Sequence, residues 1–197
     1  MNVPIGTVGY NGFMPDSREQ QLDRIIEHVA GHGMSDTSLR DLATATDTSH
    51  RMLNYHFGGR AGLVAAIVER TENAQRDQLR SIADSATSPT DIVTTQWETL
   101  TDPKLAPLIR MFFELFALAI HDRPGTEGFL DAMTAPWLDV ASEVAERVGI
   151  DADRDELRLG VAVSRGLLME VLASGDPEPA TRSLHRFLDM WEASRGA

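Results

Sequence analysis

Hydrophobic residues recur at helical spacing along almost the whole chain. The first group lies on one face of a helix that begins near Ser17: Leu22, Ile25, Ile26 and Val29. A Gly-His-Gly run follows this group, and glycines at such a position end a helix because they adopt backbone angles that other residues avoid. The pattern therefore predicts one amphipathic helix before the glycines.

A second, much shorter helical pattern follows the glycines. Leu39, Leu42 and Ala43 share one face, and Ser38 precedes them at the position of a helix cap. Asp41 stands three residues after Ser38, which is the spacing of a capping box, where each side chain bonds the backbone amide of the other residue. These features predict a short helix that begins directly after Ser38.

A third short helix is predicted after the polar break Thr-Asp-Thr. Its apolar pattern consists of Met52, Leu53 and Tyr55, and either Thr48 or Ser49 can cap it. Two adjacent glycines then end the pattern, because glycine allows a positive φ and a sharp change of direction.

The remaining chain is also predicted to be helical, with breaks at segments that contain proline and glycine. The expected helices cover residues 60–84, 89–100, 103–121, 127–148, 153–174 and 179–195. No segment of useful length alternates apolar and polar residues as a half-buried strand does. We therefore predict an all-α fold of about nine helices, with a small N-terminal unit of three helices and a larger bundle behind it.

The composition is that of a globular protein with an acidic surface. Charged residues make up 24% of the 197 residues, and the formal net charge is −12. An acidic chain is repelled by nucleic acids and by anionic membranes unless its basic groups cluster. Lys104 is the single lysine among 18 basic residues, so any contact with phosphate is expected to use the fork-shaped guanidinium of arginine.

Cysteine usage and the apolar stretches bear on the compartment. The chain has no cysteine, which excludes disulfides and fits a reducing cytoplasm. Residues 1–16 lack the features of a signal peptide and are expected to form a flexible arm. The most apolar stretch is interrupted by Pro107, Arg110 and Glu114, so it is expected to be a buried helix. We expect a cytoplasmic protein without a membrane partner.

The two short helices are separated by a turn of three or four residues, which is the spacing of a helix-turn-helix. In that motif the second helix lies in the major groove, with its first residues at the edges of the bases. Ser49, His50 and Arg51 would hold those positions, and Arg51 can form two hydrogen bonds with guanine. An ordinary helical hairpin inside a bundle explains the spacing equally well.

The stretch from Arg18 to about Arg70 resembles the DNA-binding domain of the TetR family of bacterial transcription regulators. The similar segments are GHG (31–33), TSLRDLA (37–43), Ser49 and LNYHFGGRAGL (53–63). The resemblance implies a helix-turn-helix DNA-binding domain over residues 17–60, and a ligand-binding and dimerisation domain over residues 61–197. The candidate contacts with double-stranded operator DNA are Thr37, Ser38, Arg40, Thr48, Ser49, His50, Arg51, Asn54, Tyr55 and Arg60.

Three departures from the family pattern concern DNA affinity. Asp47 stands where the family usually has a small residue, and Asn54 stands where it usually has a tyrosine that contacts phosphate. Between Asp16 and Arg60 there are five arginines against seven carboxylates. Binding to DNA draws on the release of counterions by basic groups, so we expect modest affinity with strong salt sensitivity.

The helix expected over residues 103–121 is apolar on nearly every side, which is typical of the centre of a bundle. Its residues can form plain core, but the resemblance implies a cavity for a small hydrophobic or amphipathic ligand in this half of the chain. The candidate ligand contacts are Trp97, Met111, Phe112, Glu114, Leu115, Phe116, Met133, Trp137 and Met169. Glu114 either pairs with Arg110 one turn earlier or faces the cavity, and the pairing is slightly favoured.

The last two helices carry apolar faces and several small residues. Family members typically form dimers by packing these two helices into a four-helix bundle, and paired half-sites on DNA require a dimer. Packing within one chain explains the same faces. The candidate residues of a homodimer interface are Leu157, Val161, Ser164, Leu168, Leu172, Leu184, Phe187, Leu188 and Trp191.

Enzyme and metal motifs do not stand out. There is no nucleophile elbow, phosphate-binding glycine loop, dinucleotide fingerprint or H-E-x-x-H motif, so we expect neither an enzyme nor a cofactor. His28 and His32 have the spacing of a metal pair but no evident third ligand, so we expect no metal. We predict a ligand-responsive transcriptional regulator, more specifically a repressor. The alternative is a small-molecule-binding or protein-interaction module of the same fold with weak or lost DNA binding.

Overall fold

The computed structural model describes residues 18–34 and 37–195, and the arm expected over residues 1–16 lies outside these ranges. The described residues form nine helices and no strand, which confirms the predicted all-α class. The helices are α1 (Arg18–His32), α2 (Leu39–Ala45), α3 (His50–Phe57), α4 (Arg60–Ser85), α5 (Pro89–Leu100), α6 (Ala106–Ile120), α7 (Phe129–Arg147), α8 (Arg154–Ser174) and α9 (Glu178–Arg195).

Side-chain caps fix the short helices α2 and α3. Ser38 caps α2 and forms the predicted capping box with Asp41, in which each side chain accepts a hydrogen bond from the backbone amide of the other residue. Ser49 caps α3 by accepting a hydrogen bond from the Met52 amide at 3.1 Å. The turn between the helices passes through Asp47, which has a left-handed φ of 50°.

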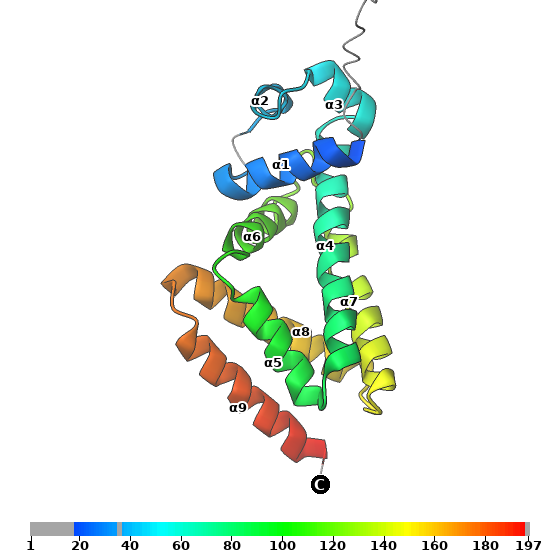
Figure 1. Cartoon of the computed structure of the whole chain (residues 1–197), viewed down its shortest axis with the longest axis vertical. Coiled ribbons are helices and arrows are strands. Elements are labelled where there is room, and N and C mark those ends of the chain that lie inside the picture. Colours follow the sequence, from blue (N-terminus) through cyan, green and yellow to red (C-terminus); the bar gives the residue numbers. More distant parts are fainter. Residues whose placement is uncertain (1–17, 35–36, 196–197) are drawn as a thin grey trace, which may run out of the picture.

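One hydrophobic core joins the N-terminal helices to the larger half. Helix α1 lies across the upper part of the molecule, above α6 and against α4 (Figure 1). Leu22 and Ile25 of α1 belong to the same buried cluster as Met111 and Leu115 of α6. The N-terminal unit is therefore packed on α6 as well as connected through α4.

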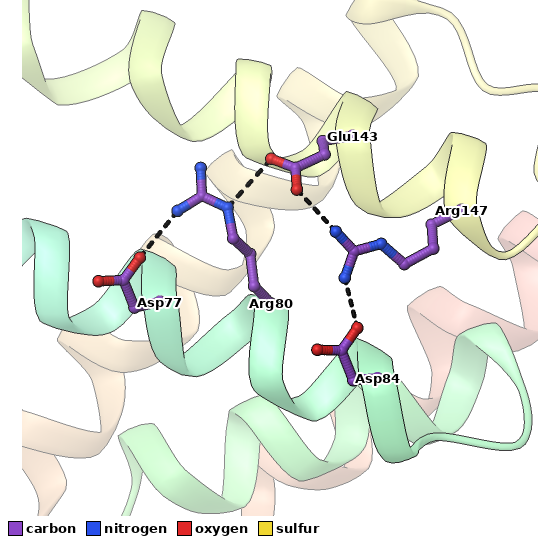
Figure 2. A network of polar contacts seen from close by, with 5 residues as sticks. All are labelled: Asp77, Arg80, Asp84, Glu143 and Arg147. Atoms are coloured by element: carbon purple, nitrogen blue, oxygen red, sulfur yellow. Dashed lines mark hydrogen bonds and ion pairs between the residues drawn. The ribbon is translucent and has the colours of Figure 1, made fainter.

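Helices α4 and α7 run side by side (Figure 1), and charged side chains connect them. Figure 2 shows Glu143 of α7 between two arginines, with Arg80 donating from its Nε at 3.0 Å and Arg147 donating at 2.8 Å. Arg80 also pairs with Asp77 at 2.9 Å, and Arg147 reaches back to Asp84 on α4. This network holds the lower part of α4 to the C-terminal half of α7.

Two smaller cores lie in the larger half of the chain. Ile82 and Ile92 form one of them with Val140 and Val144 of α7. Trp97 lies in the other, together with buried leucines of α8 and α9. Within the described ranges no helix is both long and apolar enough to cross a membrane.

Candidate DNA-binding surface and ligand cavity

The N-terminal end of α3 presents the residues expected to read DNA. His50 and Arg51 are exposed on its first turn, directly after the cap Ser49. The Ser49 oxygen already accepts the Met52 amide, so its hydroxyl group remains as a donor for phosphate. Thr48, the other candidate cap, is half-buried and donates its amide to the Ala43 carbonyl.

The hydroxyl groups before α2 are engaged locally. The Ser38 hydroxyl donates to Asp41 at 2.6 Å, and this bond, with that of the Ser38 amide, holds the pKa of the Asp41 carboxyl below its usual value. The Thr37 hydroxyl donates to the Gly33 carbonyl at 3.2 Å. Both residues therefore shape the start of α2, and Ser38 remains exposed.

Arg60, one of the candidate DNA contacts, is engaged by backbone carbonyls of its own chain. Its guanidinium donates to the Met34 carbonyl at 2.8 Å and to the Thr37 carbonyl. These bonds tie the start of α4 to the loop between α1 and α2. The side chain lies half-buried because carbonyls of this loop satisfy its donors.

Two exposed arginines remain for DNA in this part of the chain. Arg40 and Arg51 are exposed, and no carboxylate of the described residues lies within 4 Å of either guanidinium. Arg18 is paired with Glu19 at 3.0 Å, and Arg24 donates to Gln21 at 2.8 Å. Arg40 and Arg51 are therefore the exposed arginines of the described N-terminal helices whose guanidinium groups form no ion pair with a described residue.

The side chain of Asn54 is bound within its own helix, whereas that of Tyr55 is exposed to solvent. The Asn54 amide donates back to the His50 carbonyl at 3.0 Å and contacts the His50 ring, so it is bound within its own helix. Tyr55 is 81% exposed, which excludes the alternative that it packs in the core. Phe57 is buried as predicted, and the Arg18 guanidinium lies 5.3 Å from its ring centre. Tyr55 is the aromatic side chain of α3 that can reach a phosphate.

The larger half contains a cavity of about 800 Å³ lined by residues of α4 to α9, with a contribution from α1. Its wall is mainly apolar. Trp97, Phe112 and Trp137 line it, as expected for ligand contacts. A cavity of this size is sufficient for a drug-sized molecule.

The other six expected ligand contacts lie elsewhere. Met111, Leu115 and Met133 are buried in the core shared with the N-terminal helices, and Phe116 packs against the same core. None of these four residues lines the cavity. Met169 is more than half exposed on the outer surface.

Glu114 neither lines the cavity nor depends on Arg110 for a partner. Its carboxylate accepts hydrogen bonds from the Met34 amide at 2.9 and 3.1 Å, one to each oxygen. The backbone carbonyl of Met34 accepts a hydrogen bond from the Arg60 guanidinium. Met34 is therefore held from α6 and from α4 at once.

A buried acid in the cavity wall has its own partners. Glu72 is buried and accepts a hydrogen bond from the Trp137 ring nitrogen, and Arg76 lies 3.5 Å from it. Burial raises the pKa of the Glu72 carboxyl, while the bond from Trp137 and the charges of Arg76 and Arg165 act in the opposite direction.

Arg165 of α8 also lines the cavity and has fewer partners. Its guanidinium donates to the Met133 carbonyl at 2.6 Å and lies 5.8 Å from the ring centre of Phe112. No carboxylate of the described residues lies within 4 Å of it. Burial lowers the pKa of Arg165, while the charge of Glu72 acts in the opposite direction.

Two glutamines of the wall have amide atoms without partners. Gln96 is 8% exposed, and neither its amide nitrogen nor its amide oxygen has a hydrogen-bond partner among the described residues. The amide oxygen of Gln75 is in the same state. Sequence reasoning missed Gln75, Gln96 and Arg165. Arg165 could have been found because it lies four residues after Val161 and three before Leu168, on the same face of α8.

The residues expected at a dimer interface mostly face the interior of their own chain. Leu168, Leu184 and Leu188 are buried around Trp97. These three and five others also line the cavity: Leu157, Val161, Ser164, Phe187 and Trp191. Leu172 is half-buried. The apolar periodicity of α8 and α9 is therefore explained by packing within one chain.

The two histidines with metal-pair spacing contact each other. The rings of His28 and His32 stack with their centres 4.3 Å apart, and His32 Nδ1 lies 2.9 Å from the His28 carbonyl. The described part of the chain contains no group of three side chains that could hold a metal ion.

Comparison with known proteins finds a family model that matches the N-terminal helices and solved structures of similar fold. Residues 22–67 match the model of the N-terminal domain of bacterial regulatory proteins of the tetR family. No curated protein matches the chain. A solved structure described as a TetR-family transcriptional regulator from Rhodococcus sp. has a TM-score of 0.69 and 22% identity, and covers 88% of this chain and 96% of its own.

Two further solved structures are similar over nearly the whole chain. A TetR transcription regulator from Haloarcula marismortui ATCC 43049 has a TM-score of 0.68 and 15% identity, and covers 87% of this chain and 98% of its own. The multidrug binding protein EbrR, complexed with imidazole, has a TM-score of 0.64 and 22% identity, with coverages of 87% and 89%. Residues 22–67 thus match the N-terminal domain of the tetR family of bacterial regulatory proteins, and the described chain has the all-α fold of these solved structures.

Proposed function

We propose that the chain is a ligand-responsive transcriptional repressor, which binds operator DNA through α3 and is released when a small molecule occupies the cavity. The observation that carries this proposal is the double contact of α6. Leu108 and Phe112 of α6 line the cavity, whereas Glu114 of the same helix holds the Met34 amide beside the DNA-binding helices. Helix α6 therefore contacts both the cavity and the loop residue Met34, which precedes the proposed DNA-reading helices α2 and α3.

The coupling follows from this arrangement. A ligand that binds one position of α6 better than another shifts the population toward that position. A shift of α6 moves the Glu114 carboxylate, and with it the loop at Met34 and Thr37. Arg60 extends the movement to the start of α4, because its guanidinium bonds the carbonyls of the same two residues. Movements of this kind in packed helices change the orientation of a recognition helix.

We also propose a homodimer that uses the outer faces of α8 and α9. Leu159 and Met169 of α8 and Met190 of α9 are each more than half exposed. Gly166 lies on the same side of α8 as Leu159 and Met169, and a side chain added there would meet open space. A second chain can approach this face closely. A two-fold dimer would place two copies of α3 on half-sites one turn of DNA apart.

The reading function is tested by selecting bound fragments from a library of the source genome at low salt. We expect one or a few fragments with two-fold symmetric sequence, and Arg51→Gln should fail to retain them. The half-buried Arg60 and the engaged Asn54 favour a module without DNA binding as the competing function. Failure to select any fragment at low salt would establish that competing function instead.

A further inference from the structure

We infer that the cavity binds an amphipathic carboxylic acid, with the carboxylate at Arg165 and an apolar body along α5 and α6. The inference rests on the proposed ligand-responsive function and specifies the chemistry of the ligand.

The charges inside the cavity wall do not balance. Glu72 is already paired, because Arg76 lies 3.5 Å from it and Trp137 donates to it. Arg165 carries a second positive charge and has a carbonyl and an aromatic face as partners, but no carboxylate of the described residues within 4 Å. Arg76 does not line the cavity itself, but it neutralises Glu72 from behind the wall, so the group of two arginines and one acid retains one positive charge. A ligand carboxylate would neutralise it, and a guanidinium can bind a carboxylate with two parallel hydrogen bonds.

The other charged residues of the wall do not change this balance. Asp23 is exposed and pairs with Arg70 at 3.1 Å, and Glu156 pairs with Arg195 at 3.2 Å. Glu27 and Lys104 are both exposed to solvent, and their opposite charges leave the sum unchanged. Screening by solvent weakens these outer charges relative to the more buried Arg165.

The unpartnered amides indicate that this is a built site. Gln96 is more than nine-tenths buried in the wall, and both of its amide atoms lack partners, as does the amide oxygen of Gln75. Buried polar groups are nearly always hydrogen-bonded, and a ligand that brings polar atoms into the cavity can bond these amides. A purely hydrocarbon ligand would leave them unsatisfied.

The rest of the wall suits an apolar body. Ile92, Val93 and Leu100 of α5 and Leu108 and Phe113 of α6 line it. A cationic amphiphile fits less well, because the Glu72 carboxylate is covered and Arg165 would repel the ligand. The carboxylate therefore selects the ligand, and the apolar body contributes most of the buried area.

The test compares three probes of the same chain length on the full protein by isothermal titration calorimetry: decanoate, methyl decanoate and decyltrimethylammonium. Decanoate should bind about 10-fold more tightly than either of the others, as one charge-assisted pair contributes about that factor. Arg165→Gln should remove this preference and leave methyl decanoate binding unchanged. Arg165→Lys should retain part of it. Arg158→Gln, which alters an exposed arginine on the same helix, is the matched control and should change nothing.

Each outcome decides one claim. Equal or tighter binding of the ester or the ammonium compound, or no binding of decanoate, overturns the inferred ligand class. Release of operator DNA by one of those probes would still support the proposed function. Decanoate that binds through Arg165 without changing operator affinity supports the ligand class and contradicts the proposed function. If Arg165→Gln does not fold, the wild-type preference and the Arg165→Lys variant decide.

Discussion

At the scale of single residues, the effect of adding a side chain at a glycine depends on contacts that the local sequence does not reveal. Gly62 lies inside α4, where glycine is normally unfavourable, and a methyl group added there would lie 1.8 Å from the Phe57 carbonyl oxygen. Gly31 lies in α1, and a methyl group added there would meet open space. The close approach of α4 to the end of α3 therefore depends on Gly62, and the adjacent glycines at 58 and 59 account for the turn alone.

Gly62→Ala should destabilise the protein by about 3 kcal/mol, because backbone atoms of α3 or α4 must move to admit the methyl group. Gly31→Ala should be neutral or stabilise by about 0.5 kcal/mol, since alanine favours a helix over glycine. Urea denaturation of both variants measures this difference. Equal stabilities of the two variants would show that α3 and α4 do not approach each other closely in solution.

Glu72 makes a prediction about pH. Because burial raises the pKa of its carboxyl, the folded state binds the proton more tightly than the unfolded state. Its contribution is therefore most stabilising below the ordinary value of 4.5 and is lost as the pH rises through the raised pKa. Glu72→Gln, which cannot ionise, should gain stability relative to the wild type between pH 4.5 and pH 7. A stability difference that does not change with pH would contradict a raised pKa.

At the scale of elements, the proposed DNA-reading helix α3 has few basic residues to bind phosphate. Two arginines per chain, Arg40 and Arg51, give about four phosphate contacts in a dimer, so the logarithm of the binding constant should fall with that of salt concentration with a slope of about −4. Arg51→Gln should weaken operator binding by about 10-fold or more and make the slope shallower. Fluorescence anisotropy across salt measures both. Arg182→Gln, which changes an exposed arginine of α9, is the control and should leave the slope unaltered.

The connection between α4 and α7 depends on one acid in particular. Glu143 receives hydrogen bonds from Arg80 and Arg147, whereas Asp77 receives one from Arg80 within the same helix (Figure 2). Glu143→Gln should lower the melting temperature by a few degrees, and Asp77→Asn by less, since exposed pairs contribute little singly and networks contribute more. The two variants can be compared by differential scanning calorimetry. A larger effect of Asp77→Asn would show that the ion pairs between α4 and α7 contribute no more to stability than the pair within α4.

The sequence predicted the helices well and the faces of the larger helices poorly. Local signals such as Ser38 with Asp41, or Ser49 before α3, are complete within one turn, and the structure confirms these caps. The helix expected over residues 103–121 begins later in the structure, at Ala106, and Leu105 is its N-cap residue. Apolar periodicity shows which face of a helix is buried, but it does not show whether that face packs against its own chain, a ligand or a partner chain.

The same limit applies to contacts of the candidate site residues that the sequence did not indicate. Leu157 and Trp191 satisfied the pattern of an interface, but they line the cavity of their own chain. Arg60 satisfied the family pattern of a basic residue, but its guanidinium found backbone carbonyls across a loop. Glu114 was expected to interact within its helix or with a ligand, but its carboxylate accepts a hydrogen bond from the amide of Met34, 80 residues away in the sequence. Such contacts depend on the fold and leave no local signal.

At the scale of the whole molecule, the reading unit and the cavity share α6 and one core, so we propose that they respond together although they act as two functional parts. Glu114→Ala would leave the Met34 amide without this acceptor and should cost about 1–3 kcal/mol of stability. It should also reduce the effect of a cavity ligand on operator binding, while Glu114→Gln keeps an acceptor oxygen and most of the effect. Parallel measurements of operator affinity with and without ligand test this. Full retention of coupling in Glu114→Ala would show that the path avoids this contact.

The central claim is the coupling between the cavity and α3. It is tested most directly by measuring the affinity for a selected operator fragment with and without a saturating cavity ligand, and the affinity for that ligand with and without the fragment. The account predicts that both affinities fall by the same factor, of at least about 5-fold, because coupling between two binding sites is reciprocal. A ligand that binds the cavity and raises the melting temperature, but leaves operator affinity unchanged, would contradict it.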